Sequence, residues 1–199
     1  MNNNLVKAGY NKAARTYLSK RDIFKNNKYL DLFIEKLPTG ASILDIGCGA
    51  GVPIDKYLSD KGLKVLGIDI SENQIKLARK NVPEAKFNVV DMEELKRNEH
   101  SVDAIVSFYA IFHINREKHQ ALFKTIQSYL KPKGLLLVTM GSSDWEGEED
   151  NFHGVKMYWS HYGSEQNRKI IEKTGFEILL DEIDTSGEEK HQVVMARKI

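Results

Sequence analysis

Residues 43–51 read Ile-Leu-Asp-Ile-Gly-Cys-Gly-Ala-Gly, a short apolar run that ends in three alternate glycines. The apolar run predicts a buried strand, and the residues after Gly51 have the pattern of a helix. Glycine is needed where the backbone turns tightly or comes into contact with a ligand. The first turn of the following helix directs free N–H groups at such a ligand. This stretch therefore predicts a strand, a ligand-binding loop and a helix.

A carboxylate follows at the end of the next apolar run. Asp69 stands 18 residues after Gly51 (69 − 51). In nucleotide-binding βαβ units, a carboxylate at this place accepts hydrogen bonds from the ribose hydroxyls. Another reading is that Asp69 caps the helix that begins near Glu72. Together, the loop and the carboxylate favour a nucleoside-binding site.

Expected strands alternate with expected helices through the middle of the chain. A parallel sheet with helices on both faces is the architecture that this alternation predicts. The last two strands are separated by a short loop at 184–190, so at least one of them runs antiparallel. The expected strands are 42–46, 64–68, 86–90, 104–108, 135–140, 176–183 and 191–197, and the expected helices are 52–60, 72–80, 92–96, 116–130 and 164–174.

The composition limits the classes of function. The chain has 199 residues, 41% of them hydrophobic, which suits one domain over residues 1–199. A net charge of +1 argues against broad binding of nucleic acid. The one cysteine, Cys48, cannot form an internal disulfide, which fits the cytoplasm. No apolar run approaches the roughly 18 residues that span a bilayer, so no membrane partner is expected. The oligomeric state is not predicted.

The glycine spacing distinguishes between cofactors. Dinucleotide sites favour G-x-G-x-x-G, whereas this loop has G-x-G-x-G with Asp45 two residues ahead of Gly47. The pattern resembles the D-x-G-x-G-x-G signature of class I (Rossmann-like) S-adenosylmethionine-dependent methyltransferases, and the resemblance extends over about residues 10–197. It implies S-adenosyl-L-methionine as the cofactor. It also implies a three-layer αβα sandwich with a mostly parallel seven-stranded sheet, order 3-2-1-4-5-7-6, last strand antiparallel.

The resemblance also implies a set of cofactor contacts. In the family, the loop wraps the methionine part, with an acid such as Asp45 near its amino group. Asp69 would hold the ribose, Asp91 and Met92 would meet the edge of the adenine, and Ile70 would pack on its face. Residues 131–135 resemble the family's L-K-P-G-G turn, with Lys133 where glycine is commoner. The implied cofactor set is Asp45, Gly47, Cys48, Gly49, Gly51, Asp69, Ile70, Asp91, Met92, Ser107 and Tyr17.

The methyl acceptor is expected beyond the fourth strand, where residues 107–114 read Ser-Phe-Tyr-Ala-Ile-Phe-His-Ile. His113 is the candidate general base, because imidazole titrates near neutral pH. A histidine here could instead cap the next helix or line the wall. Methyltransferases that act on base amino groups or glutamine often carry an N/D-P-P-Y/F tetrad here. Its absence favours small oxygen, sulfur or amine nucleophiles.

Two flanking segments are expected to close the site: a helical cap at 1–37, and an insert or lid at 141–162 that reads as a long loop. Tyr10 and Tyr17 share a helix face in the cap, and Arg15 or Arg21 would meet the cofactor carboxylate. The insert is rich in aromatic residues, which suit a wall for a small, partly apolar acceptor, and its acids read as a solvated run. The expected acceptor pocket is Tyr10, Tyr109, Trp145, Tyr158, Trp159 and His161.

The sequence thus predicts a methyltransferase that acts on a small molecule. No metal is expected, because the histidines of the insert lack tight ligand spacing. Two other functions stay open. One is an NAD-dependent oxidoreductase on a Rossmann fold, and the other is a catalytically silent S-adenosylmethionine-binding module.

Overall fold

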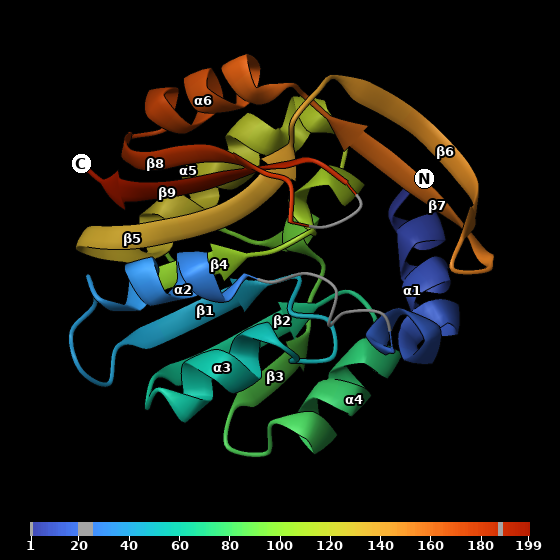
Figure 1. The fold of residues 1–199 in the computed structure, drawn as a ribbon, viewed down its shortest axis with the longest axis horizontal. Helices are drawn as coiled ribbons and strands as arrows, with labels where there is room; N and C mark the ends of the chain where they lie inside the picture. Colours follow the sequence, from blue (N-terminus) through green and yellow to red (C-terminus); the bar gives the residue numbers. More distant parts are fainter. Residues whose placement is uncertain (1, 20–25, 187–188) are drawn as a thin grey trace.

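Strand β1 (Ser42–Ile46) lies in the middle of a seven-stranded sheet of order β3-β2-β1-β4-β5-β9-β8. The computed structural model describes residues 2–19, 26–186 and 189–199 (Figure 1). The strands from β3 to β5 run parallel, and β9 is antiparallel to both of its neighbours. The other strands of this sheet are β2 (Lys64–Asp69), β3 (Lys86–Val89), β4 (Val102–Ser107), β5 (Leu130–Gly141), β8 (Phe176–Asp184) and β9 (His191–Lys198).

The predicted α/β class and the mostly parallel sheet are confirmed. The strand labels differ from the expected order 3-2-1-4-5-7-6 because β6 and β7, which were not predicted, form a sheet of their own. With β6 and β7 left out, β8 and β9 are the sixth and seventh strands of the large sheet in chain order, and β9 lies between β5 and β8. Strand β9 is the antiparallel one, as expected for the last strand.

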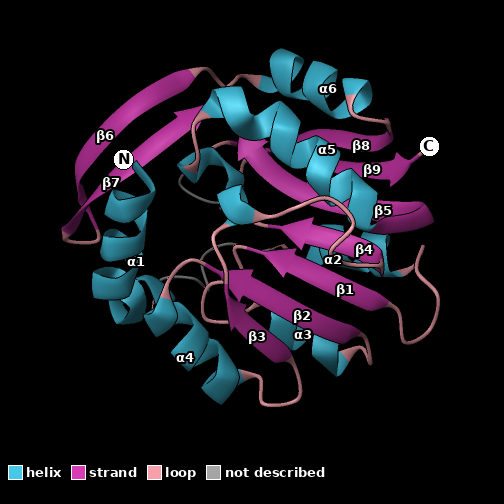
Figure 2. Ribbon diagram, turned by 180° about the vertical axis from the view of Figure 1, so that it is seen from behind, coloured by secondary structure: helices cyan, strands magenta, loops and turns pink. Residues whose placement is uncertain are grey.

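Alternate side chains of β1 point into two different cores. Leu44 packs in the cluster that contains Phe123 of α5 (His119–Tyr129) and Ile171 of α6 (Ser164–Lys173). Ile43 packs in the cluster that contains Phe33 of α2 (Asn27–Ile34) and Leu58 of α3 (Ile54–Asp60). Successive side chains of a strand face opposite sides of the sheet, so both faces are apolar and both are covered by helices. Figures 1 and 2 show α3 and α5 on opposite faces.

The remaining helices lie near the carboxyl ends of the strands or follow them. Helix α4 (Glu72–Asn81) has Ser71 as its N-cap, with the Ser71 hydroxyl accepting from the amide of Gln74. The expected helical cap at 1–37 contains α1 (Asn2–Leu18) and α2, while residues 1 and 20–25 lie outside the described part. None of the described helices is long and apolar enough to cross a membrane. The described residues also form short 3-10 turns, which are η2 (Met92–Glu94), η3 (Ile111–His113) and η4 (Arg116–Lys118).

The structure corrects the prediction of a long loop at 141–162. This segment contains β6 (Trp145–Phe152) and β7 (Val155–His161), which pair as an antiparallel ribbon. Strand β6 is exposed along most of its length, so it lacks the apolar alternation by which a strand is recognised. Strand β7 packs against α1, and a Cβ on Gly9 would lie 2.9 Å from Cε of Met157. The ribbon therefore lies beside the amino-terminal helix (Figure 1).

Residues 131–134, near the start of β5, have a backbone conformation that suits glycine. The pairing of β4 with β5 moves from Val102 opposite Leu130 to Ala104 opposite Leu135, so residues 131–134 bulge. Lys133 has a φ of 62° within this bulge, in the left-handed region that favours glycine.

Candidate functional site

The glycine-rich loop crosses the carboxyl ends of β1 and β2. Gly47, Gly49 and Gly51 have φ values of 81°, 55° and 75°, in the region that side chains rarely adopt. A Cβ on Gly47 would lie only 2.2 Å from the Cβ of Ala110. The amide of Gly47 donates to the carbonyl of Ile68 at 2.8 Å, which ties the loop to β2. Glycine is therefore required by both conformation and space.

Asp69 joins this loop to helix α4. Its Oδ2 accepts from the amide of Gly49 at 2.9 Å, and its Oδ1 accepts from the amide of Ser71 at 2.8 Å. Burial raises the pKa of Asp69 to about 6, although the two amides act in the opposite direction. Each carboxylate oxygen keeps a lone pair for a further donor. The side chain that caps α4 is that of Ser71.

A cavity opens along the ends of β1, β2, β3 and β4. Most of the cofactor residues implied by the sequence line it, and so does Tyr17 of the cap. The lining members of that set are Gly47, Cys48, Gly49, Asp69, Ile70, Asp91, Met92 and Tyr17.

Three residues of the implied cofactor set do not line this cavity. The hydroxyl of Ser107 donates to the carbonyl of Ile46 at 2.7 Å and so ties β4 to β1. Gly51 faces the packed side chains of Val82 and Phe87. Asp45 is 2% exposed and lies behind the loop. Their places are structural, because a buried strand end must satisfy its polar groups locally.

Beneath the loop, Asp45 faces a second buried acid. Burial, followed by the charge of Asp45, raises the pKa of Asp55 well above its usual value, which holds Asp55 in its neutral form. Burial likewise raises the pKa of the Cys48 thiol. A thiol with a raised pKa is a poor nucleophile, so Cys48 acts as part of the wall.

After the end of β3, Asp91 contacts the amino-terminal helix. Its Oδ1 accepts from the amide of Glu93 at 2.9 Å, and its Oδ2 accepts from Nδ2 of Asn3 at 2.7 Å. Asn3 also lines the cavity. Sequence reasoning missed Asn3, because no motif links a polar residue of the first helical turn to a strand end far along the chain.

His113 lies at the end of η3, between the cap helix and the ribbon. Its Nδ1 is 2.9 Å from the carbonyl oxygen of Tyr158, and its Nε2 is 2.7 Å from the hydroxyl of Tyr10. A carbonyl can only accept, so Nδ1 carries the proton and Tyr10 donates to Nε2. Burial lowers the pKa of His113 to about 4, which keeps the imidazole neutral. Neither ring nitrogen caps the following turn, where Asn115 accepts from the amide of Glu117.

The expected acceptor residues divide between two cavities. Tyr10 and Tyr109 line the principal one, as His113 does. Trp145 and His161 line a second cavity beside β6 and β7. Trp159 also lines the second cavity, and its ring centroid lies 4.3 Å from that of His113. The two cavities are therefore separated by the packed rings around His113.

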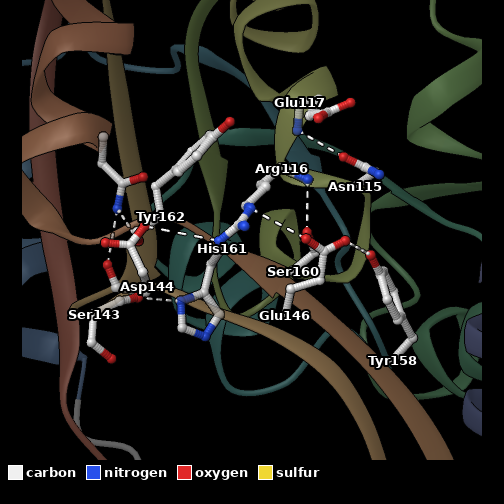
Figure 3. A network of polar contacts seen from close by, with 12 residues as sticks. Asn115, Arg116, Glu117, Ser143, Asp144, Glu146, Tyr158, Ser160, His161 and Tyr162 are labelled. Atoms are coloured by element: carbon white, nitrogen blue, oxygen red, sulfur yellow. Dashed lines mark hydrogen bonds and ion pairs between the residues drawn. The ribbon is translucent and has the colours of Figure 1, made fainter.

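The base of the ribbon is held by a polar network (Figure 3). The hydroxyl of Tyr158 donates to Glu146 at 2.7 Å, and Glu146 pairs with Nε of Arg116 at 3.3 Å. The amide of Arg116 donates to the hydroxyl of Ser160 at 2.9 Å. Tyr158 lines neither cavity, so its side chain anchors the ribbon while its carbonyl holds His113.

Of the two arginines expected near the cofactor carboxylate, Arg15 and Arg21, the structure describes Arg15 alone. Arg15 is exposed on α1 and does not line the principal cavity. Arg21 lies outside the described residues. The wall also includes Gln74, which the sequence reading placed only on an expected helix.

Comparisons with known proteins agree with this arrangement. Residues 43–134 match the family model described as a methyltransferase domain. The 2-methyl-6-phytyl-1,4-hydroquinone methyltransferase of Synechocystis sp. is 35% identical over 121 residues, which are 59% of this chain and 36% of that protein. The crystal structure of magnesium protoporphyrin IX methyltransferase from Synechocystis PCC 6803, with bound SAM, superposes with a TM-score of 0.78 at 16% identity, covering 100% of this chain and 98% of that one.

Another relative acts on a different class of acceptor. The tRNA (carboxymethyluridine(34)-5-O)-methyltransferase of Arabidopsis thaliana is 32% identical over 116 residues, or 57% of this chain. This chain spans only 27% of that protein's length and 36% of the hydroquinone methyltransferase.

Proposed function

We propose that this chain is a class I S-adenosylmethionine-dependent methyltransferase that transfers the methyl group to an oxygen, sulfur or nitrogen nucleophile of a small molecule. The observation that carries the proposal is the continuity of one cavity. It runs from the glycine loop and Asp69 to the hydrogen-bonded pair of Tyr10 and His113. A donor site and an acceptor site would thus share one cavity.

In this proposal, the strand ends bind S-adenosyl-L-methionine. The close approach permitted at Gly47 and Gly49 suits the methionine part, and the remaining lone pairs of Asp69 suit the ribose hydroxyls. Asp91 and Met92 receive the adenine, with Ile70 on its face. Asp45 acts through the loop that covers it. The sulfonium of the bound cofactor supplies an electrophilic methyl group.

Tyr10 and His113 form the acceptor end. The neutral imidazole fixes the hydroxyl of Tyr10, and together they orient the nucleophile and exclude water. A base with a pKa of about 4 accepts a proton readily only from an acidic donor. Acceptors that release a proton easily, such as thiols, phenols or the ammonium product of amine methylation, therefore suit this site better than simple alcohols.

The cap and the ribbon enclose this acceptor end in the proposal. Val6 and Ala13 of α1 pack in one cluster with Met157 of β7. Tyr10 reaches His113 from one side, and the carbonyl of Tyr158 holds it from the other. We expect the enzyme to act in the cytoplasm, where a free thiol such as that of Cys48 stays reduced.

The composition of the wall argues against a dinucleotide. The described lining residues include the carboxylates of Asp69 and Asp91 and no lysine or arginine. Two carboxylates favour a cofactor that carries positive charge over one that carries a pyrophosphate. A silent binding module shares the same donor site, so only a transfer assay separates it from an enzyme.

Two experiments test the proposal. Calorimetry with S-adenosylhomocysteine and with NAD should give one-to-one binding of the first and no binding of the second. Radiolabelled methyl transfer from S-adenosylmethionine is then screened against thiols, phenols, amines and total tRNA. Transfer to a small molecule supports the proposal, and transfer to tRNA alone replaces the acceptor class. Binding without any transfer indicates the silent module, and binding of NAD alone overturns the donor site.

A further inference from the structure

Gln74 is a buried polar side chain on the wall of the principal cavity. It lies in the first turn of α4 and is 1% exposed. Within the described part of the chain, neither its Nε2 nor its Oε1 has a hydrogen-bond partner. A buried amide without partners destabilises the folded protein, so its retention calls for a reason. Its position on the cavity wall supplies one.

The surroundings of Gln74 fix where its amide lies. The hydroxyl of Ser71 accepts from the Gln74 backbone amide at 3.2 Å and donates to Oδ1 of Asn11 at 2.7 Å. A Cβ on Gly49 would lie 3.9 Å from Oε1 of Gln74. Gly49 is itself the donor to Asp69. The amide of Gln74 therefore borders the junction of Gly49 and Asp69.

The hydrogen-bonding capacity at this junction is one-sided. A vicinal diol carries two hydroxyl donors and two oxygens that can accept. An ionised carboxylate only accepts, so Asp69 can meet the donors of a diol and not its acceptor oxygens. A primary amide both donates and accepts. Gln74 therefore supplies the donor that Asp69 lacks.

We propose that Gln74 is a second ribose-binding residue of this site, whose amide donates to a hydroxyl oxygen of the diol held by Asp69. The inference rests on the proposed function, because that function puts the ribose beside Asp69. It assigns the unmet donor and acceptor of Gln74 to the bound nucleoside. The unpaired amide of Gln74 thus lowers the stability of the free protein, and its contact with the ribose raises the affinity for the cofactor.

The test compares Gln74→Leu and Gln74→Glu with the unchanged protein. Gln74→Leu should weaken binding of S-adenosylhomocysteine about three- to tenfold, the usual effect of losing one hydrogen bond. Its Tm without ligand should be equal or higher, because an unsatisfied amide is replaced by an apolar group of similar size. Gln74→Glu keeps an acceptor and loses the donor, so it should bind no better than Gln74→Leu. Gln120→Leu, the same change at an exposed position of α5, is the matched control.

Deoxy analogues of the ligand complete the test. The 2′-deoxy and 3′-deoxy forms of S-adenosylhomocysteine should each bind the unchanged protein more weakly. For the hydroxyl that contacts Gln74, this loss should shrink in Gln74→Leu, because the two changes remove the same bond. Unchanged affinity in Gln74→Leu, or fully additive losses with both analogues, overturns the assignment. Failure of the unchanged protein to bind S-adenosylhomocysteine overturns the proposed function itself.

Discussion

The donor side and the acceptor side of the cavity are built in different ways. The donor side consists of consecutive turns at the ends of β1, β2 and β3, within the span from Gly47 to Met92. The acceptor side brings together Tyr10 and His113, which are 103 residues apart, and Tyr158, which is a further 45 residues along. A local motif therefore specifies the first, while the packing of α1 on the ribbon specifies the second.

The donor side and the acceptor side also differ in the kinds of contact that form them. Backbone amides and strand-end carboxylates form the donor side, as the bonds of Asp69 to Gly49 and Ser71 illustrate. Side-chain hydroxyls, rings and an imidazole form the acceptor side. Substitutions on the donor side should therefore disturb the backbone and the affinity for cofactor. Those on the acceptor side should change turnover while the cofactor still binds.

The largest effect is expected at Gly47. Gly47→Ala forces a side chain into the left-handed region and places a Cβ 2.2 Å from that of Ala110. We expect a loss of about 2–5 kcal/mol in the free energy of unfolding, together with loss of cofactor binding. Gly62→Ala is the control, since Gly62 has a φ of 80° and nothing within 4 Å of its added Cβ. Urea titrations that give equal losses for both variants would remove the steric argument.

Asp69→Ala is expected to have the next largest effect. Removing the carboxylate removes charge-assisted hydrogen bonds and releases the amides of Gly49 and Ser71. Affinity for S-adenosylhomocysteine should fall about tenfold to a hundredfold in calorimetry. Asp60→Ala, at an exposed position of α3, should leave the affinity unchanged. Wild-type affinity in Asp69→Ala would remove Asp69 from the ribose role.

On the acceptor side, Tyr10→Phe and His113→Ala should lower turnover about tenfold or more, with the Kd for cofactor kept within about twofold. Both changes break the hydrogen bond between the Tyr10 hydroxyl and Nε2 of His113. Tyr57→Phe removes a hydroxyl that is bonded to Asp31 outside the cavity and should have no effect. Steady-state kinetics with unchanged turnover would reduce Tyr10 and His113 to wall residues.

Acid should act on the two sides with opposite signs. Burial lowers the pKa of His113 and His119 to about 4, so between pH 6.5 and pH 4 the unfolded chain binds protons that the folded chain does not. The contribution of His113 and His119 to stability is therefore present above pH 6.5 and is lost as the pH falls. His119 lies in α5, outside both sides of the cavity, so the contrast is between these buried histidines and Asp69. Asp69, whose pKa is raised to about 6, is protonated in the folded state first, so its contribution runs the other way.

His119→Leu isolates one of these groups. Between pH 7 and pH 5, the loss in unfolding free energy should be about 1–2 kcal/mol smaller in this variant than in the unchanged protein. His119 is 1% exposed, so solvent does not weaken the effect. Denaturant titrations at the two pH values provide the measurement. Parallel pH profiles for the two proteins would contradict the neutral, buried state of His119.

The smallest effect is expected outside both sides. Lys133→Gly relieves a left-handed backbone and should raise stability by less than about 1 kcal/mol, because the gain is offset by the greater freedom of glycine in the unfolded chain. Cofactor affinity and turnover should not change. A change in the cofactor affinity or in the turnover would show that the bulge at residues 131–134 is coupled to the cavity.

The sequence predicted the structure best where the residues in contact are close together along the chain. The strand at 42–46 and the placement of Asp69 at the end of the next strand were predicted, because both lie within one βαβ unit, whereas the bond of Asp69 to the amide of Gly49 was not predicted. The shared face of Tyr10 and Tyr17 is confirmed, with ring centroids 5.3 Å apart. Helix periodicity alone predicted that contact.

Other features depend on contacts that no spacing reveals. The ribbon was read as a loop because β6 is exposed and carries acids, and the contact of Asn3 with Asp91 joins positions 88 residues apart. Gln74 follows a recognisable N-cap, but a polar residue in a first helical turn usually faces water. Ser107 lies in the predicted segment at the end of β4, but its hydroxyl donates to the carbonyl of Ile46 in β1, a contact that no spacing reveals.

The two ends of the ribbon lie next to each other in the fold. A Cβ on Gly141 would lie 2.0 Å from Nδ1 of His161, and among the described strands β6 and β7 pair only with each other. The hairpin thus joins the rest of the chain at a single stem, while β7 also packs against α1. Hairpins of other lengths could be grafted at that stem to retune which molecules receive the methyl group, while the nucleoside-holding turns stay as they are.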